Sequence, residues 1–232
     1  MNILITGASR GIGRGAADAL SAAGHQVLGT STRGGEALLA ADFADPAAAA
    51  RCWARAIERL GRVDVLVNNA GVFEAVADTA DEAEWQAAWA RTLQVNLQAS
   101  ADLSRLAIAH FREHGGGRIV NVASRAAYRG DSPQHWHYAA SKAAMVAVTK
   151  TIARGYAAEN ILAFAVTPGF TVTEMTAEYL ASRGGEKILA DIPLGRVASA
   201  AEVGETIRWL ATDAPASATG SVIDVNGASY VR

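Results

Sequence analysis

Cysteine is nearly absent from this chain of 232 residues, because Cys52 is the only one. A single cysteine excludes a disulfide bond within the chain and suits the reducing conditions of the cytosol. Long apolar runs are also missing, and none approaches the roughly 18 residues that a membrane-spanning helix needs. Met1 leads directly into a predicted strand, which leaves no room for a signal peptide. We therefore expect a cytoplasmic protein.

The chain also lacks an excess of charge of either sign. Its 21 basic and 23 acidic residues give a formal net charge of −2 at pH 7. This balance provides no electrostatic basis for binding nucleic acid or a membrane surface, and we expect neither as a partner. Hydrophobic residues make up 50% of the chain, which is ordinary for a globular protein. The length suits one domain spanning residues 1–232, with a sizeable core.

A glycine-rich turn follows the first apolar run. Residues 2–6 predict a buried strand, the segment Gly7-Ala-Ser-Arg-Gly11-Ile-Gly13 comes next, and residues 14–23 predict a helix that ends at Gly24. Glycines let the backbone approach a phosphate closely, and the first turn of a helix offers it free N–H groups. The spacing differs from the common Gly-x-Gly-x-x-Gly, and any tight turn between strand and helix can look similar. Its position after the first strand favours dinucleotide binding.

Strands and helices are predicted to alternate along the rest of the chain. Further strands are expected at residues 26–30, 38–42, 63–67, 118–124, 161–166 and 221–225. Helices are expected at residues 45–60, 81–114 with a break, 138–158 and 199–212. This order predicts an α/β fold, namely a Rossmann-type doubly wound parallel sheet of about seven strands with helices on both faces. The less regular segment at residues 173–195 is a candidate substrate lid.

Several polar or glycine-containing segments directly follow predicted strands. Gly7, Asn69, Ser124 and the pair Pro168-Gly169 each occupy such a place. Ligands of open parallel sheets bind outside the carboxyl ends of the strands. The sequence therefore predicts one site along a single edge of the sheet.

Tyr138 and Lys142 are four residues apart in the run Tyr-Ala-Ala-Ser-Lys. In a helix this spacing places both side chains on one face. A neighbouring cation lowers the pKa of a phenol, and a shift of about 3 units needs about 4 kcal/mol. The pair therefore indicates a general acid/base. The chain has only three lysines, so a lysine beside Tyr138 is harder to attribute to chance. Tyrosine and lysine at helical spacing are nevertheless more often neighbours on a protein surface.

Taken together, these motifs resemble the classical short-chain dehydrogenase/reductase family, and most closely its 3-oxoacyl-carrier-protein reductases. They occur in family order across nearly the whole chain: Thr6-Gly7-Ala-Ser-Arg-Gly11-Ile-Gly13, Asn68-Asn69-Ala70-Gly71, Asn96, Ser124, Tyr138 to Lys142, Pro168-Gly169 and Thr173. The interval from Ser124 to Tyr138 is about one residue longer than the family pattern. Asn226-Gly227-Ala228 also replaces a more usual Asp-Gly-Gly.

The resemblance implies a nicotinamide cofactor and hydride transfer between it and a carbonyl or secondary alcohol. Tyr138 would exchange a proton with the substrate oxygen, and Ser124 would hold that oxygen. Lys142 would lower the pKa of Tyr138 and bind the nicotinamide ribose. Asn96 would anchor a water in a proton relay to Lys142, unless it is merely a polar residue at a helix kink.

The expected cofactor is NADP(H) rather than NAD(H). A carboxylate at the end of the second strand selects NAD, but residues 30–32 contain no acid, and Arg10 and Arg33 lie nearby in the sequence. Guanidinium groups bind phosphate in a bidentate way, although both arginines could be solvated loop residues. The expected cofactor-binding residues are Gly7, Ser9, Arg10, Gly11, Ile12, Gly13, Thr30, Ser31, Arg33, Asp42, Phe43, Asn69, Ala70, Gly71, Tyr138, Lys142, Pro168, Gly169, Thr171 and Thr173. Asp42 would contact the adenine amino group or cap its strand.

The substrate pocket is expected to include Tyr128, Trp136 and Phe170. No metal site is expected, because His110 and His114 have helical spacing but no acidic third ligand. The resemblance implies a homotetramer, and the many small apolar residues of the helix at 138–158 would allow close packing.

The main alternative to a small-molecule substrate is an acyl carrier protein. A reductase for that acidic partner needs basic residues at the active-site entrance. Some of these basic residues would be expected at residues 113–116 and 159–160, but these segments contain the acidic Glu113 and Glu159. This weakens the carrier-protein alternative without excluding it. A dinucleotide-binding regulator without catalysis is a more remote alternative, because the expected catalytic residues are all present.

Overall fold

A parallel sheet forms the centre of the molecule, and the computed structural model describes residues 1–172 and 185–232. The sheet consists of β1 (Asn2–Ile5), β2 (Gln26–Ser31), β3 (Leu38–Ala40), β4 (Val65–Asn68), β5 (Gly117–Val122), β6 (Ile161–Pro168) and β9 (Val222–Val225). These seven strands follow the order β3-β2-β1-β4-β5-β6-β9, and every neighbouring pair is parallel. The predicted Rossmann-type sheet is therefore confirmed.

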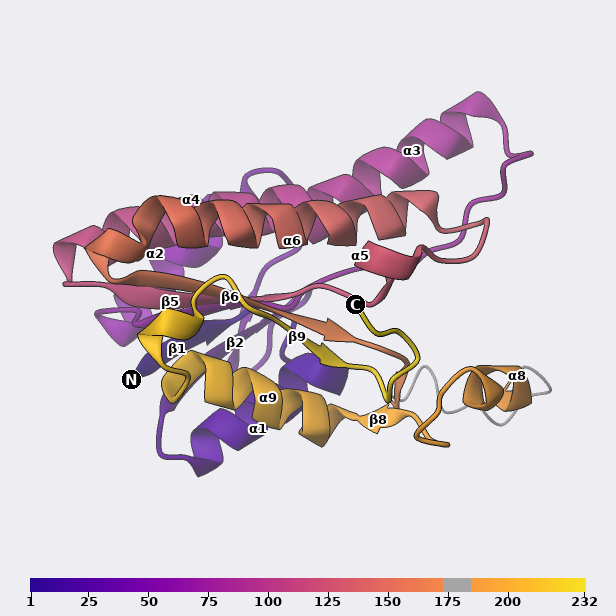
Figure 1. The fold of residues 1–232 in the computed structure, drawn as a ribbon. Coiled ribbons are helices and arrows are strands. Elements are labelled where there is room, and N and C mark those ends of the chain that lie inside the picture. The colour runs from indigo at the N-terminus through magenta and orange to yellow at the C-terminus, as the bar shows by residue number, and fades with distance from the viewer. Residues whose placement is uncertain (173–184) are drawn as a thin grey trace.

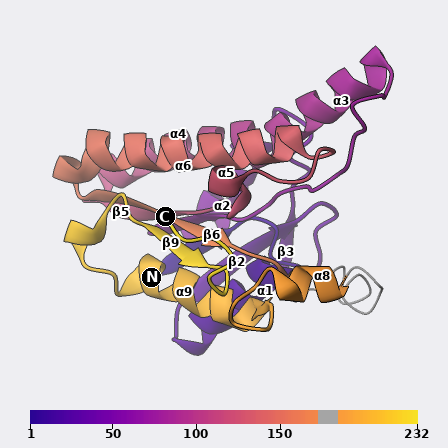
Figure 2. The ribbon, with the colours of Figure 1, turned by 45° about the vertical axis from the view of Figure 1, so that its right-hand side comes forward.

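Helices cover both faces of this sheet (Figures 1 and 2). One face carries α2 (Ala48–Leu60), α3 (Glu82–Leu93), α4 (Ala99–Glu113) and α6 (Trp136–Tyr156), and the other carries α1 (Gly11–Ala22) and α9 (Ala200–Thr212). Shorter elements complete the described chain: α5 (Ala126–Arg129), α8 (Gly185–Ala190), and a separate two-stranded sheet of β7 (Thr171–Val172) and β8 (Ala198–Ser199).

Alternate residues of the central strands build the two large cores, one on each face of the sheet. In β1, Ile3 and Ile5 face the cluster under α1 and α9, whereas Leu4 belongs to the cluster under α2, α4 and α6. All three side chains are fully buried. Because successive strand residues point to opposite faces, a sheet covered on both sides requires an unbroken apolar run. That requirement explains why the short strands of this chain were recognisable in the sequence.

Capping residues explain several helix boundaries. Ser199 and Glu202 form a capping box at the start of α9, and Asp81 accepts the N–H of Glu84 at the start of α3. The helix predicted from residue 45 begins only at Ala48, because Asp45 accepts the N–H of Ala47 in a preceding turn. Helix boundaries commonly shift where a first turn is tightened.

The break predicted within residues 81–114 is a π-helix, Gln94–Gln98, between α3 and α4. Of the predicted lid, residues 173–184 lie outside the described residues, and the remainder includes α8. The amide of Leu194, after α8, donates to the carbonyl oxygen of Gly227 at 3.1 Å, which ties this segment to the chain after β9. No helix in the described part of the chain is long and apolar enough to cross a membrane.

Candidate active site

The glycine turn lies at the point where the strand order reverses. The chain passes from β1 outward to β2 and β3 and then returns to β4 on the other side of β1. A crevice forms at such a switch point, outside the carboxyl ends of the strands. Gly7 begins the turn with φ of +67°, a conformation that glycine adopts without strain. A Cβ atom at Gly13 would overlap the carbonyl oxygen of Gly7, so only glycine fits there.

The start of α1 is open to an anion. Arg10 occupies the N-cap position, no side chain caps the helix, and its first turn contains no acidic residue. The first N–H groups of a helix have no partner within the helix, and they carry its positive dipole end. The site thus fits the pyrophosphate of a dinucleotide in both shape and charge.

Threonine hydroxyls hold the loops around this turn. Thr6 Oγ1 accepts the N–H groups of Asn69 and Ala70, each at 2.9 Å. The Asn69 side chain in turn donates to the carbonyl oxygens of Thr6 and Gly7 at 2.9 and 3.0 Å. The buried Thr30 accepts the N–H of Gly7 at 3.1 Å. These bonds fix the chain after β1 to the chain after β4 and to the end of β2.

Asn96 occupies the π-helix and positions the segment after Gly71. Its Oδ1 accepts the N–H of Val72 at 2.7 Å, and its Nδ2 donates to Val72 O at 3.0 Å and to Ser141 Oγ at 3.2 Å. The side chain is fully buried, and both Nδ2 hydrogens are used. Its contacts therefore link the cavity wall to α6, next to Lys142.

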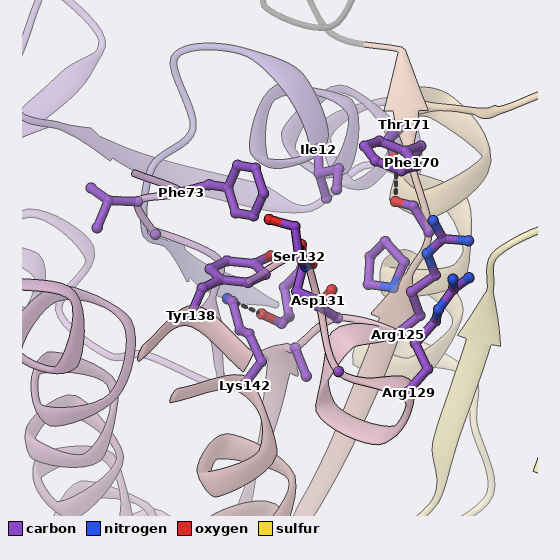
Figure 3. A pocket seen from close by; sticks show the side chains of 18 of the residues that line it. Ile12, Phe73, Arg125, Arg129, Asp131, Ser132, Tyr138, Lys142, Phe170 and Thr171 are labelled. Atoms are coloured by element: carbon purple, nitrogen blue, oxygen red, sulfur yellow. Dashed lines mark hydrogen bonds between the residues drawn. The ribbon is translucent and has the colours of Figure 1, made fainter. Parts of the chain in front are cut away.

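Ser124, Tyr138 and Lys142 come together at the carboxyl end of β5, and all three line one cavity of about 730 Å³. Ser124 follows β5, and its Oγ accepts the N–H of Ala126 at 3.1 Å. Tyr138 and Lys142 lie on successive turns of α6 (Figure 3). Lys142 Nζ donates to Val122 O at 2.9 Å and lies 5.8 Å from the centre of the Tyr138 ring.

Burial controls the charge of this pair. Burial raises the pKa of the Tyr138 phenol to about 12, with a hydrogen bond from Ser124 opposing that rise and the nearby Asp131 carboxylate adding to it. Burial also lowers the pKa of the Lys142 ammonium to about 8. The expectation that Lys142 lowers the pKa of Tyr138 therefore stays a prediction, which this raised value does not decide. Burial has the largest effect on the pKa of the phenol, and the Lys142 ammonium donates to Val122 O.

Other predicted residues lie around the same crevice. Ile12, Asn69, Gly71, Pro168, Gly169, Phe170 and Thr171 line the cavity. At the end of β2, Ser31 Oγ donates to Gly34 O at 3.2 Å, and Arg10 and Arg33 are exposed without an ion pair to any described residue. Asp42 accepts the N–H of Ala44 at 3.1 Å, while Phe43 is buried in the core. Thr173 lies outside the described residues.

Two residues expected in the substrate pocket are not part of the cavity wall. Trp136 is 53% exposed and packs edge-on against Trp85 on α3, because it precedes Tyr138 by half a helical turn and points away. Tyr128 stacks on Tyr230, with Arg232 over its ring. Only Phe170 of the three expected residues lines the cavity.

The sequence reasoning missed several wall residues. Phe73 places its ring 4.7 Å from that of Tyr138 and stacks on His135. Arg125, Arg129, Asp131 and Ser132 also line the cavity (Figure 3). Asp191 lines it as well. The sequence offered one signal for two of them, namely closeness to a predicted site residue. Phe73 comes two residues after Gly71, and Arg125 directly follows Ser124. Among the described residues, no group of three or more His, Cys, Asp or Glu side chains could hold a metal ion.

Comparison with known proteins agrees with this arrangement. The family model for short chain dehydrogenases matches residues 1–184. The 3-oxoacyl-[acyl-carrier-protein] reductase of Escherichia coli is 33% identical over 240 residues, which cover 98% of this chain and 96% of that protein. The corresponding reductase of Thermotoga maritima is 38% identical over 174 residues, covering 75% of this chain and 68% of that protein.

Solved structures show the same fold. A protein from Sinorhizobium meliloti, proposed to be a short-chain alcohol dehydrogenase, has 33% sequence identity and a TM-score of 0.89 over 98% of this chain and 95% of that one. A protein from Agrobacterium tumefaciens, proposed to be a 2-deoxy-d-gluconate 3-dehydrogenase, was solved with bound NADP. It has 28% identity and a TM-score of 0.86 over 100% of this chain and 96% of that one. The chain therefore belongs to the short-chain dehydrogenase family of oxidoreductases.

Proposed function

We propose that this protein transfers hydride between NADP(H) and a small carbonyl or secondary alcohol substrate, with Tyr138 as the general acid/base. The observation that carries the proposal is the meeting of Ser124, Tyr138 and Lys142 in one cavity beside the open start of α1. The bound nicotinamide would supply the hydride. The protein positions the substrate and handles the proton.

The two pKa values support proton donation in the direction of reduction. Because burial raises the pKa of Tyr138 to about 12, the phenol is protonated at pH 7 and ready to donate to a carbonyl oxygen that Ser124 holds. Because burial lowers the pKa of Lys142 to about 8, the ammonium can return that proton near neutral pH. Asn96 would support this exchange by fixing Val72 and Ser141 around the lysine.

The residues around the glycine turn fit a dinucleotide. Gly7, Gly11 and Gly13 with the uncapped α1 would hold the pyrophosphate, and Lys142 would bind the nicotinamide ribose. The preference for NADP(H) rests on the exposed Arg10 and Arg33 and on the absence of an acid at residues 30–32. The NADP bound by the Agrobacterium tumefaciens relative supports the same preference.

Reduction of an acyl chain on a carrier protein is the second candidate, because the Escherichia coli relative is named for it. Glu113 and Glu159, whose acidic side chains were the argument against a carrier protein, do not lie beside the cavity of the same chain. Arg112 pairs with Glu159 at 3.0 Å, and Gly117 N donates to Asn160 O, so these residues lie where β5 and β6 begin. The cavity lies at the opposite ends of those strands. The proposed small-molecule substrate is instead supported by the deoxygluconate named for the Agrobacterium tumefaciens relative.

We also propose that the protein is a homotetramer. The outer face of α6 exposes Ala140, Ala143 and Ala147, small residues that allow a second helix to approach closely. Val146, Ile152 and Ala153 are buried within the chain and do not contribute to such an interface.

A panel of aldehydes, ketones, secondary alcohols and an acyl thioester, assayed with NADPH and NADH by absorbance, tests the proposal. Oxidation of NADPH by a small ketone, or the reverse reaction with the alcohol, is the expected result. Turnover of the thioester alone would favour the carrier-protein candidate. The absence of turnover across the panel, with cofactor binding retained, would contradict the proposed catalysis.

A further inference from the structure

Two arginines that the catalytic proposal does not use line the same cavity. Arg125 directly follows Ser124, and Arg129 ends the short helix α5 four residues later. Side chains with this spacing lie on one side of a helical turn. In Figure 3, both guanidinium groups lie across the cavity from Tyr138, Lys142 and Phe73. A substrate held between these two sides would be anchored by the arginines at one end and by Tyr138 at the other.

The charge of Arg125 is poorly compensated by its surroundings. Arg125 is only 9% exposed, and its single anionic contact with a described residue is a long one, 3.4 Å from Nη1 to Asp191 Oδ2. The same oxygen accepts a shorter bond of 2.6 Å from Arg129 Nη1. Buried charges are normally paired and fully hydrogen-bonded. Here one half-exposed carboxylate serves two guanidinium groups, and burial lowers the pKa of Arg125.

Most donors of both guanidinium groups have no partner among the described residues. Within the described residues, Arg125 uses only Nη1, and its guanidinium stacks over the Phe170 ring at 5.0 Å. Arg129 also uses only Nη1, which donates to Asp191 and to the carbonyl oxygen of Ser229. The described charged residues that line the cavity are Arg125, Arg129, Lys142, Asp131 and Asp191. Three cations against two anions leave one positive charge among these described residues, which a monoanion would neutralise.

We propose that Arg125 and Arg129 bind a carboxylate of the substrate, so that this enzyme acts on an oxo acid or the corresponding hydroxy acid. A guanidinium matches a carboxylate through two parallel hydrogen bonds, and such charge-assisted bonds are strongest where water is excluded. Arg125 would supply the buried cation and Arg129 the more exposed one. The inference rests on the proposed function, because the carbonyl of the same molecule must reach Tyr138.

The test compares acids with their neutral esters. Straight-chain 2-oxo to 5-oxo acids and their methyl esters are assayed with wild type, Arg125→Met and Arg129→Met. Arg55→Met on α2, which removes an exposed arginine outside the cavity, is the matched control. For the acid whose length fits, wild type should show kcat/KM at least ~10-fold above that for the ester, about 1.4 kcal/mol. The ratio should fall toward one in Arg125→Met and stay unchanged in Arg55→Met.

Failure of the inference and failure of the proposed function give different results. Equal turnover of acids and esters by wild type would overturn the carboxylate subsite but would still support the proposed reductase function. This comparison uses only the wild-type protein, so it does not depend on whether a variant folds. If neither is turned over, calorimetry of the same acids with the NADP+-loaded protein decides. Saturable binding that weakens at least ~10-fold in Arg125→Met would support the subsite, whereas no binding of any acid would overturn it.

Discussion

Replacing Lys142 by methionine should stabilise the cofactor-free protein at pH 7, and the gain should shrink as the pH rises. Lys142 is 4% exposed, and burial lowers its pKa from 10.5 to about 8. Below pH 8 the folded protein must carry a buried ammonium that the unfolded chain keeps in water. A displacement of this size corresponds to roughly 3 kcal/mol of lost stability. Methionine has a similar length and no charge.

The sign follows from proton binding. Between the folded and unfolded pKa values the unfolded chain binds more protons, so the free energy of unfolding of wild type rises with pH. Linkage gives a cost of roughly 3 kcal/mol at pH 7 and roughly 1 kcal/mol at pH 9.5. The net gain of Lys142→Met at pH 7 is smaller than this cost, because methionine cannot donate to Val122 O, a bond worth about 1 kcal/mol.

Urea unfolding followed by tryptophan fluorescence at pH 7 and pH 9.5 measures this difference. The stability gap between Lys142→Met and wild type should narrow by about 2 kcal/mol over that interval. Tyr138, whose pKa is raised from 10.0 to about 12, removes stability only above pH 10 and therefore does not interfere. Lys150→Met, an exposed lysine on the same helix, should show no such change. A gap that stays constant for Lys142→Met would refute the buried ammonium.

Three further predictions concern the cofactor, the loops and the assembly. Calorimetry should show tighter binding of NADPH than NADH. Ser31→Asp should shift the preference toward NADH, because the aspartate would repel the 2′-phosphate of NADPH. A wild-type preference for NADH would contradict the assignment. Thr6→Val leaves the N–H groups of Asn69 and Ala70 without their acceptor, so unfolding should cost about 2 kcal/mol less, and an unchanged urea midpoint would refute this. Light scattering at micromolar concentration should give a mass of about four times the 24.1 kDa of one chain. A mass near 24.1 kDa would contradict the proposed assembly. A mass near twice that value would support a dimer with only one of the two interfaces.

The sheet was predictable because its strands are buried on both faces. Runs such as Ile3-Leu4-Ile5 have no polar interruption. The carboxyl ends of parallel strands all lie at one edge of the sheet, so every glycine or polar segment that follows a strand lies at that edge. The same reasoning brought Gly7, Asn69 and Ser124 to one rim. Boundaries were less accurate where a turn competes with the helix, as at Asp45.

The rest depends on contacts between distant parts of the chain. The π-helix at Gln94–Gln98 accompanies the bonds of Asn96 to Val72, 24 residues away, which no local pattern encodes. The pKa of Tyr138 depends on burial that the spacing of Tyr138 and Lys142 does not reveal. Arg125 and Asp191 meet across 66 residues, so neither could be placed in the cavity from the sequence.

The most direct test of the account is the turnover of Tyr138→Phe on the best carbonyl substrate with NADPH. Phenylalanine keeps the ring beside Phe73 and removes only the proton donor. We expect turnover to fall by at least roughly 100-fold, the lower range of general acid/base catalysis, while calorimetry shows NADPH binding close to that of wild type. Turnover near that of wild type would contradict the assignment of Tyr138 as the proton donor.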